Sequence, residues 1–240
     1  MNQNLEVIES AAHSYEENGF AIFCAFSSSD ICKLTEFAHQ WLYRLLDKWV
    51  NGKQDTHPLG EYHLWFRELG VEHNSLFKAN NRHTTPPEEI ANILMNPSMI
   101  ELLNQLGCSN YERWDEGLGW LAFRFIRPGF GDGYPFSRKE WGAAKDVFSF
   151  WIPIIGFTPQ ETIALVPGSH KREYESYLPE NGKFRKDELY FAGDVTQLDP
   201  MRPSLSSGDA IMFHPRLLHS ENIEVGETTR LSLEFRIKPI

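Results

Sequence analysis

The sequence predicts a mixed fold in which helices form the first half of the chain and an antiparallel β sandwich or jelly roll forms the second half. Helical periodicity marks residues 5–17 and 31–51, whereas strand-like segments with no long helix between them follow Gly119. In residues 230–238 apolar and polar side chains alternate strictly, so one face of that segment is apolar. Strands joined without intervening helices favour an antiparallel sheet over a parallel one.

Length and composition bound the organisation. The 240 residues, of which 41% are hydrophobic and 23% charged, are typical of a soluble globular protein and exclude disordered, collagen-like and coiled-coil classes. Because domains average roughly 150 residues, we expect one domain over residues 1–240. Residues 1–117 are then a mainly helical support region, and residues 118–240 are the jelly-roll core.

Charge and apolar patterning predict the partners and the compartment. The 33 acidic and 23 basic residues give a net charge of −10, which repels nucleic-acid backbones. Neither a membrane-length apolar run nor a signal peptide is seen, so we expect a cytoplasmic protein with no membrane partner. The cysteines Cys24, Cys32 and Cys108 are odd in number and lack CxxC spacing, which predicts reduced, buried thiols.

Capping and turn residues divide the first half of the chain into two helices and a strand. A helix over residues 5–17 ends at Asn18-Gly19, a strand over residues 20–26 follows, and Ser28 to Asp30 supplies the cap of a second helix. The second helix carries an apolar stripe as far as Asn51, which predicts packing against the core.

The rest of the first half is less regular. Residues 53–85 show no sustained period, so we expect an irregular connection with one short element near residues 62–67. Two short helices should follow, separated at Asn96-Pro97 and ended by Gly107.

Five strand-like segments make up the second half. They are Trp120 to Arg127, Asp146 to Ile155, Thr162 to Val166, Ala210 to His214, and Thr228 to Lys238. Four ordered motifs lie in or beside them: Phe150 to Pro153, Leu165 to Lys171 (LVPGSHK), Gly208 to His214 (GDAIMFH), and Leu218 to Ser220 with Arg230 beyond.

Together with Asn18-Gly19-Phe20, these motifs resemble the phytanoyl-CoA dioxygenase family, and the resemblance spans nearly the whole chain. It implies a double-stranded β-helix, which is a jelly roll, covered by helices. It also implies an Fe(II)- and 2-oxoglutarate-dependent oxygenase that hydroxylates a small organic substrate. In such enzymes two histidines and one carboxylate hold one face of the iron, and an arginine grips 2-oxoglutarate.

The resemblance assigns His219 to the iron and Arg230 to 2-oxoglutarate. Without it, His219 is a hydrogen-bonded residue at a strand end and Arg230 a solvated strand residue. The family's His-x-Asp pair is missing, because Ser137 and Lys139 occupy those positions, and no histidine lies between His83 and His170. A lysine there would repel a ferrous ion.

Several carboxylates and histidines are candidate replacement ligands. Glu140 could enter after a one-residue shift, and Asp132 or Asp146 could approach. His57, Glu61 and His63 have ligand types at plausible spacing, although exposed histidines are the more common explanation. We expect His214 to pack, because five residues along one strand place it on the face opposite to His219.

A metal-independent function is the alternative. Arg138, Lys139 and Arg230 could form a basic pocket for a carboxylate, a phosphate or a nucleotide-sugar. The competing interpretation of residues 138–140 is a solvated loop. A metal-free isomerase would need a histidine paired with a carboxylate, which the spacing does not establish. Either way the expected partner is a small, anionic molecule, and the oligomeric state is left open.

Overall fold

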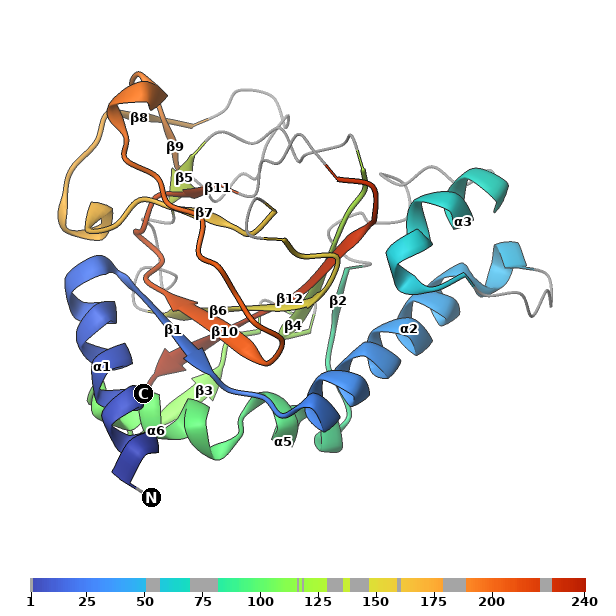
Figure 1. Ribbon diagram of the computed structural model, residues 1–240, viewed down its shortest axis with the longest axis horizontal. Coiled ribbons are helices and arrows are strands. Elements are labelled where there is room, and N and C mark those ends of the chain that lie inside the picture. The colour runs from blue at the N-terminus through green and yellow to red at the C-terminus, as the bar shows by residue number, and fades with distance from the viewer. Residues whose placement is uncertain are drawn as a thin grey trace.

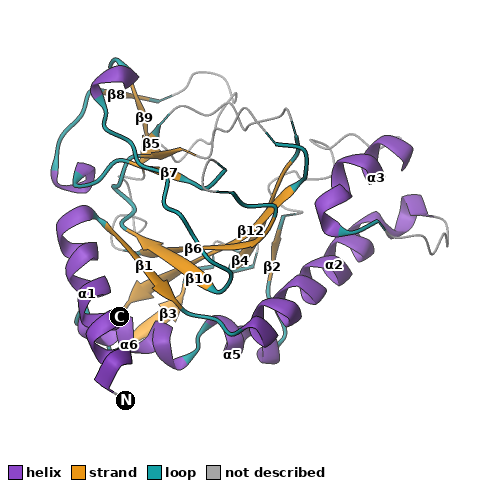
Figure 2. Cartoon of the chain, in the orientation of Figure 1, coloured by secondary structure: helices purple, strands orange, loops and turns teal. Residues whose placement is uncertain are grey.

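Two antiparallel sheets face each other, and helices cover the outer face of the larger sheet (Figure 1, Figure 2). The computed structural model describes residues 2–50, 57–69, 82–115, 117, 119–128, 136–138, 147–158, 161–178, 189–220 and 226–240. Within those residues the predicted mixed fold with a jelly-roll core is confirmed.

The larger sheet has seven strands in the order β1-β10-β6-β12-β4-β2, with β3 also paired to β12. Their bounds are β1 Phe20–Cys24, β2 His83–Thr84, β3 Tyr111–Arg113, β4 Leu121–Ile126, β6 Phe148–Ile155, β10 Asp209–Phe213 and β12 Arg230–Pro239. The smaller sheet has the order β7-β11-β5-β9-β8. Its bounds are β5 Ser137–Arg138, β7 Ala164–Leu165, β8 Ser176–Tyr177, β9 Leu189–Phe191 and β11 His219–Ser220.

The helices lie on one side of the larger sheet (Figure 2). They are α1 Asn2–Asn18, α2 Ser28–Val50, α3 Tyr62–Leu69, α5 Glu88–Leu94 and α6 Pro97–Gln105. The short 3-10 helix η1 Leu59–Glu61 precedes α3, whereas η4 Ser169–Lys171 and η5 Val195–Gln197 lie beside the smaller sheet (Figure 1). The predicted break falls at Asn96, whose side chain caps α6 by accepting from the Ser98 and Met99 amides. No helix in the described residues combines the length and apolarity needed to cross a bilayer.

The apolar stripe of α2 packs against the larger sheet as predicted. Leu34, Leu42 and Leu46 are fully buried, and the Trp41 ring stacks on Phe123 of β4 at a centroid distance of 4.0 Å. The side chains of β4 and β12 that share this side of the sheet therefore belong to one large core with the helices. The other face of the sheet is left to line the space between the sheets.

Two motifs of the resemblance meet where α1 turns into β1. The Gly168 amide donates to the Asn18 carbonyl at 2.8 Å, and the His214 amide donates to the Gly19 carbonyl at 2.8 Å. Gly19 has φ +82°, and a Cβ atom there would lie 2.4 Å from Nδ1 of His170, so only glycine fits. These motifs therefore fasten the first helix to the jelly roll.

Two details differ from the prediction. Cys24 and Cys32 are exposed and only Cys108 is buried, because Cys24 ends β1 on the face opposite to the buried Phe23 and Cys32 lies off the apolar stripe of α2. The predicted strand at residues 162–166 is paired only over Ala164–Leu165. The Thr162 hydroxyl, outside this paired part, donates to the Pro203 carbonyl at 2.9 Å.

Candidate active site

The inner face of the larger sheet carries a row of polar side chains along β12. Leu231 and Leu233 point into the helix-side core, so Arg230, Ser232 and Glu234 point toward the smaller sheet. Opposite Ser232 on β4 stands Arg124, which pairs with Glu234 at 2.9 Å. The space between the sheets, called the cup below, is therefore polar on the β4 and β12 side.

The opposite side of the cup is apolar. We call it the cup cluster, and it comprises Phe20, Trp151, Ile163, Leu165, Ile211, Phe213 and Leu217. Phe157 is partly buried against it, with its ring 5.0 Å from that of Trp151 in an edge-on arrangement. The interior between the sheets thus has hydrophobic side chains on one side and fixed polar groups on the other.

Arg230 begins β12 at the edge of the cup. Its side chain is 5% exposed, Nη1 donates to the Glu161 carbonyl, and the guanidinium lies 5.4 Å from the centre of the Phe157 ring. This placement differs from that of a solvated strand residue. A guanidinium held by a carbonyl and a ring face is a rigid donor fork of the kind that suits a carboxylate.

His219 lies on β11 of the smaller sheet and is 8% exposed. Its Nδ1 lies 2.9 Å from the Leu217 carbonyl, and its ring is 4.9 Å from that of Phe213 in the cup cluster. Because a carbonyl only accepts, Nδ1 carries the proton and the lone pair of the neutral ring is on Nε2. This tautomer is the one that a histidine metal ligand needs, and a backbone carbonyl is a common partner for fixing it.

Ser137 of β5 stands directly opposite His219 in the ladder between β5 and β11. Ser137 is buried, with 4% of its surface exposed. The register therefore puts a hydroxyl group where the resemblance leads us to expect an imidazole. Lys139, Glu140, Asp132 and Asp146 lie outside the described residues.

Arg138 is not part of a pocket with Arg230, contrary to the prediction. Its Nη1 donates to the Arg172 carbonyl at 2.9 Å, its Nη2 lies 3.4 Å from Glu173, and its guanidinium is 5.6 Å from the Tyr174 ring centre. Neighbouring residues on a strand point to opposite faces, so Arg138 projects to the outer face of the smaller sheet while Ser137 faces His219. It is 1% exposed, which also excludes a solvated side chain.

The histidine candidates of the irregular connection do not converge. Both ring nitrogens of His57 are taken by carboxylates, Glu61 at 3.2 Å and Glu68 at 3.0 Å, and the Glu68 contact is the main reason why the pKa of His57 is raised. His63 instead contacts the Thr229 hydroxyl, with Nδ1 at 3.0 Å. The predicted short element near residues 62–67 is present as α3, and η1 precedes it at residues 59–61.

His214 packs between other rings. Its ring centroid is 5.3 Å from that of His170 and 6.1 Å from that of Tyr15, and its Nδ1 accepts from the Arg216 amide at 3.1 Å. Across the described part of the chain, no three His, Cys, Asp or Glu side chains gather closely enough to hold a metal ion. The described donors therefore fit one ligand of an iron centre and do not fit a complete centre.

Three neighbours of the site were missed from the sequence. Phe157 and Glu161 support the Arg230 guanidinium, and Thr229 carries the contact with His63. Glu161 contacts Arg230 through its backbone carbonyl, and because every residue has a carbonyl, the sequence gives no sign of this contact. The Gly156-Phe157 pair was the available signal, since a glycine after a strand often marks a close approach of two backbones.

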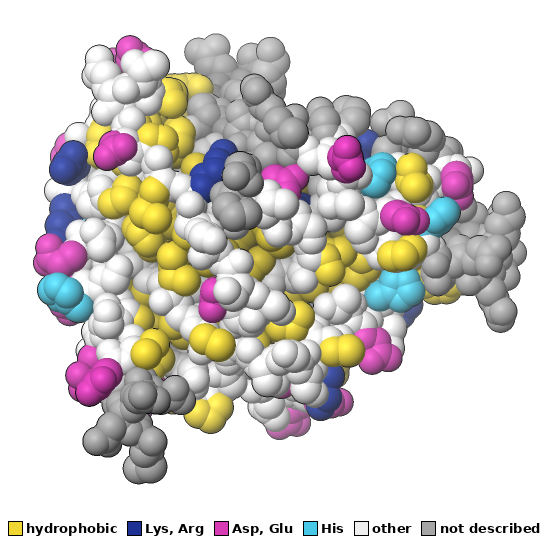
Figure 3. Space-filling view, viewed as in Figure 1, with side chains coloured by type: hydrophobic (Ala, Val, Ile, Leu, Met, Phe, Trp, Pro, Cys, Tyr) yellow, Lys and Arg dark blue, Asp and Glu magenta, His cyan; other side chains and the backbone are white. Residues whose placement is uncertain are grey.

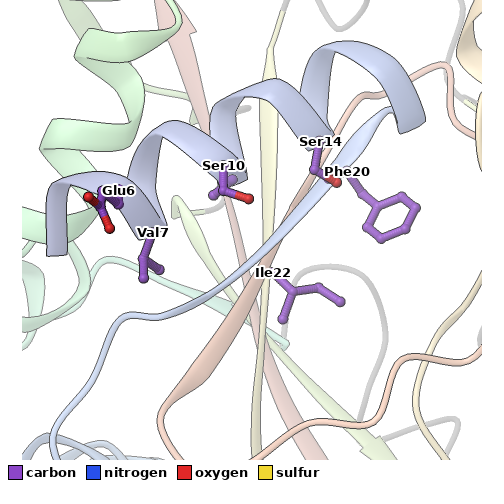
Figure 4. A pocket seen from close by; sticks show the side chains of 7 residues that line it. Glu6, Val7, Ser10, Ser14, Phe20 and Ile22 are labelled. Carbon is purple, nitrogen blue, oxygen red and sulfur yellow. The ribbon is translucent and has the colours of Figure 1, made fainter. Parts of the chain in front are cut away.

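A groove of about 760 Å³ lies between α1 and the edge strand β1, next to the cup cluster (Figure 4). It is lined by Glu6, Val7, Ser10, Ala11, Ser14, Phe20 and Ile22. Glu6 is the one titratable group among these residues, and the Ser14 hydroxyl donates to the Phe20 carbonyl at 3.0 Å. The groove thus has little to offer catalysis. On the face in Figure 3, basic side chains lie singly or in small groups among acidic ones.

Comparison with known proteins identifies the fold. No family model matches the sequence, and no curated protein matches it. Among solved structures, EvdMO1 matches with a TM-score of 0.62 and 16% identity, over 97% of this chain and 50% of that one, so the chain spans about half the length of EvdMO1.

Two further structures extend the comparison. The epimerase SnoN, in complex with Fe3+, alpha ketoglutarate and nogalamycin RO, matches with a TM-score of 0.52 and 14% identity over 98% of this chain and 84% of that one. EctD from S. alaskensis, with 2-oxoglutarate and 5-hydroxyectoine, matches with a TM-score of 0.55 and 13% identity over 95% and 75%. The chain therefore shares the jelly-roll fold of these three solved structures.

Proposed function

We propose that this chain binds a small carboxylate in the cup, and that Arg230 is the residue that grips it. The observation that carries this proposal is the buried, doubly supported guanidinium of Arg230 at the edge of an otherwise apolar cluster. Charge-assisted hydrogen bonds between a carboxylate and a fixed donor fork are stronger in such apolar surroundings than in water. 2-Oxoglutarate is the first ligand to test, because SnoN and EctD have been solved with it.

One use of this site is oxygenation of a small organic substrate by a protein of the phytanoyl-CoA dioxygenase type. When bound, ferrous iron would supply the activation of oxygen. His219 would hold it, and Glu140 is the candidate for a carboxylate ligand. This use requires at least one donor from outside the described residues, because Ser137 stands opposite His219.

The second candidate is metal-independent binding or conversion of an anionic metabolite, with no redox chemistry. The position of Ser137 favours it, since a serine hydroxyl is a poor ligand for ferrous iron and Lys139 follows two residues later. A lysine close to His219 would add positive charge for an anionic ligand. Both candidate functions require a carboxylate bound at Arg230, so only the binding of iron distinguishes them.

The first experiment is a calorimetric titration of metal-free protein with 2-oxoglutarate. Arg230→Ala should raise the Kd at least about 100-fold, because it removes a bidentate, charge-assisted contact. Arg236→Ala on the same strand is the matched control, and thermal unfolding verifies that both variants fold. An unchanged Kd in Arg230→Ala would contradict the proposal.

An anaerobic titration with ferrous iron and 2-oxoglutarate then separates the two candidates. A visible charge-transfer band that is lost in His219→Ala would support the oxygenase. Calorimetric binding of 2-oxoglutarate without such a band would support the metal-independent function. If neither binding nor a band is found, both candidates are wrong for this ligand.

A further inference from the structure

Residues 57–69, which comprise η1 and α3, form a wall beside the start of β12 (Figure 1). The wall is anchored on the helix side of the larger sheet. Leu59, Tyr62 and Trp65 are buried there, and the Tyr62 ring lies 5.1 Å from that of Phe125 on β4. Its position relative to the sheet is therefore set by core packing.

The wall contacts β12 through Thr229, the residue immediately before Arg230. The Thr229 amide donates to the Gly60 carbonyl at 2.7 Å, and the His63 amide donates to the Thr229 hydroxyl at 3.2 Å. Nδ1 of His63 lies 3.0 Å from the same hydroxyl oxygen. Thr229 is fully buried, so these three contacts replace the water that its polar groups would otherwise bind.

Thr229 is also confined on its other side. Gly156 has φ +75°, and a Cβ atom there would lie 2.5 Å from the Thr229 carbonyl oxygen, so the two backbones touch. Phe157, the next residue, lies under the Arg230 guanidinium, and Glu161 accepts from it. The wall and Gly156 therefore hold the backbone at Thr229 from two sides, while Phe157 and the Glu161 carbonyl contact the Arg230 side chain.

We infer that His63 is a positioning residue for Arg230, and that it sets the direction of the guanidinium by fixing Thr229. The inference rests on the proposed carboxylate site. A threonine hydroxyl can donate to one partner and accept from another, so the single Thr229 side chain can satisfy both the His63 ring and the His63 amide. Loss of the contact between the His63 ring and the Thr229 hydroxyl removes part of the support of Thr229 from the wall. Small displacements of a binding group weaken directional contacts strongly.

The test uses calorimetric titration of the full-length, metal-free protein with 2-oxoglutarate. His63→Ala and Thr229→Val should each raise the Kd about fivefold to tenfold, as expected for one hydrogen bond. Thr229→Ser keeps the hydroxyl and should bind as the wild type does. The double variant should be no weaker than either single one, since both changes remove the same contact.

Two controls separate positioning from a general loss of stability. His13→Ala removes an exposed histidine on α1 and should leave the Kd unchanged. His63→Ala should also reduce the ratio of the Kd for 2-oxobutyrate, which lacks the distal carboxylate, to the Kd for 2-oxoglutarate. General destabilisation would weaken the binding of both ligands equally and leave this ratio unchanged. Melting temperatures of all variants accompany the titrations.

The outcomes distinguish this inference from the proposed function. If Arg230→Ala binds 2-oxoglutarate as the wild type does, the carboxylate site itself is wrong. If Arg230→Ala loses binding while His63→Ala and Thr229→Val both keep the wild-type Kd, the positioning role is wrong and the site stands. Equal weakening in Thr229→Ser and Thr229→Val would also overturn it, because the hydroxyl would then be irrelevant.

Discussion

The two halves of the cup differ in how completely they are built. On the β12 side, Arg230 is buried and supported by Phe157, by the Glu161 carbonyl and, through Thr229, by the wall. On the β11 side, His219 has the tautomer that a metal ligand requires, yet it faces a serine. Among the described residues, the β12 side therefore supplies a supported guanidinium, whereas the β11 side supplies one histidine with a serine opposite it.

The difference follows from what each ligand requires. One guanidinium with two or three supports suffices to hold a carboxylate, because its donors are already arranged as a fork. A ferrous ion needs several donors that converge at once, and one histidine alone gives a weak site. Substitution at two positions can thus remove iron binding and leave carboxylate binding in place.

The largest effect is expected from restoring the missing iron ligands beside His219. Ser137→His with Lys139→Asp should raise affinity for ferrous iron more than about 100-fold, since losing even the supporting partners of metal ligands costs 10- to 100-fold. The measurement is the charge-transfer band in an anaerobic titration with 2-oxoglutarate. Ser137→Ala is the control for the change of volume.

Failure of the double variant to gain the band would have a definite meaning. It would show that His219 and residue 137, although paired in the ladder, do not aim at a common point. Loss of the gained band on adding His219→Ala would show instead that the restored centre uses this histidine.

A smaller effect is expected from the ion pair further along the inner face. Arg124 is 8% exposed and its contact with Glu234 is 2.9 Å long, so Glu234→Leu leaves a charge buried without its partner. We expect a loss of about 2 to 3 kcal/mol in the free energy of unfolding in urea, toward the lower end for such a pair because Glu234 is partly exposed.

The double variant Arg124→Leu with Glu234→Leu should recover most of this stability, because no charge is left unpaired. Neither variant should change the Kd for 2-oxoglutarate in the folded protein. A large change in that Kd would show that the polar row belongs to the ligand site and that the carboxylate half extends beyond Arg230.

The smallest effects should come from two histidines whose pKa values shift in opposite directions. Contacts with Glu68 and then Glu61 raise the pKa of His57 in the wall, while desolvation lowers the pKa of His170 beside Gly19. The contribution of His57 is present below its usual pKa of 6.5 and is lost as pH rises through the raised value. That of His170 is present above 6.5 and is lost as pH falls through the lowered value.

Unfolding free energies measured between pH 5 and 8 at low salt test both signs. His57→Asn should flatten the decline on the alkaline side, and His170→Asn should flatten the decline on the acidic side. The His57 effect should fade with added salt, because its partners are exposed. The same slope in both variants would contradict the assignment of opposite shifts.

Much of the fold was predictable because its signals are local. The Asn96-Pro97 break, the α2 stripe and the alternation along β12 are set by neighbouring residues and match the structure. The two-residue strands β5 and β11 were missed, since they are too short to show any period. Their existence depends on partners that are distant in sequence, such as Ser137 and His219.

The sequence by itself determined the mixed fold, the identity of the candidate residues and the absence of a His-x-Asp pair, because these follow from residue types and their order. Tertiary structure decided which side chains share the cup. It placed Ser137 opposite His219, sent Arg138 to the outer face, and brought His63 to Thr229, since the sides of a strand and the partners of a backbone depend on register and packing.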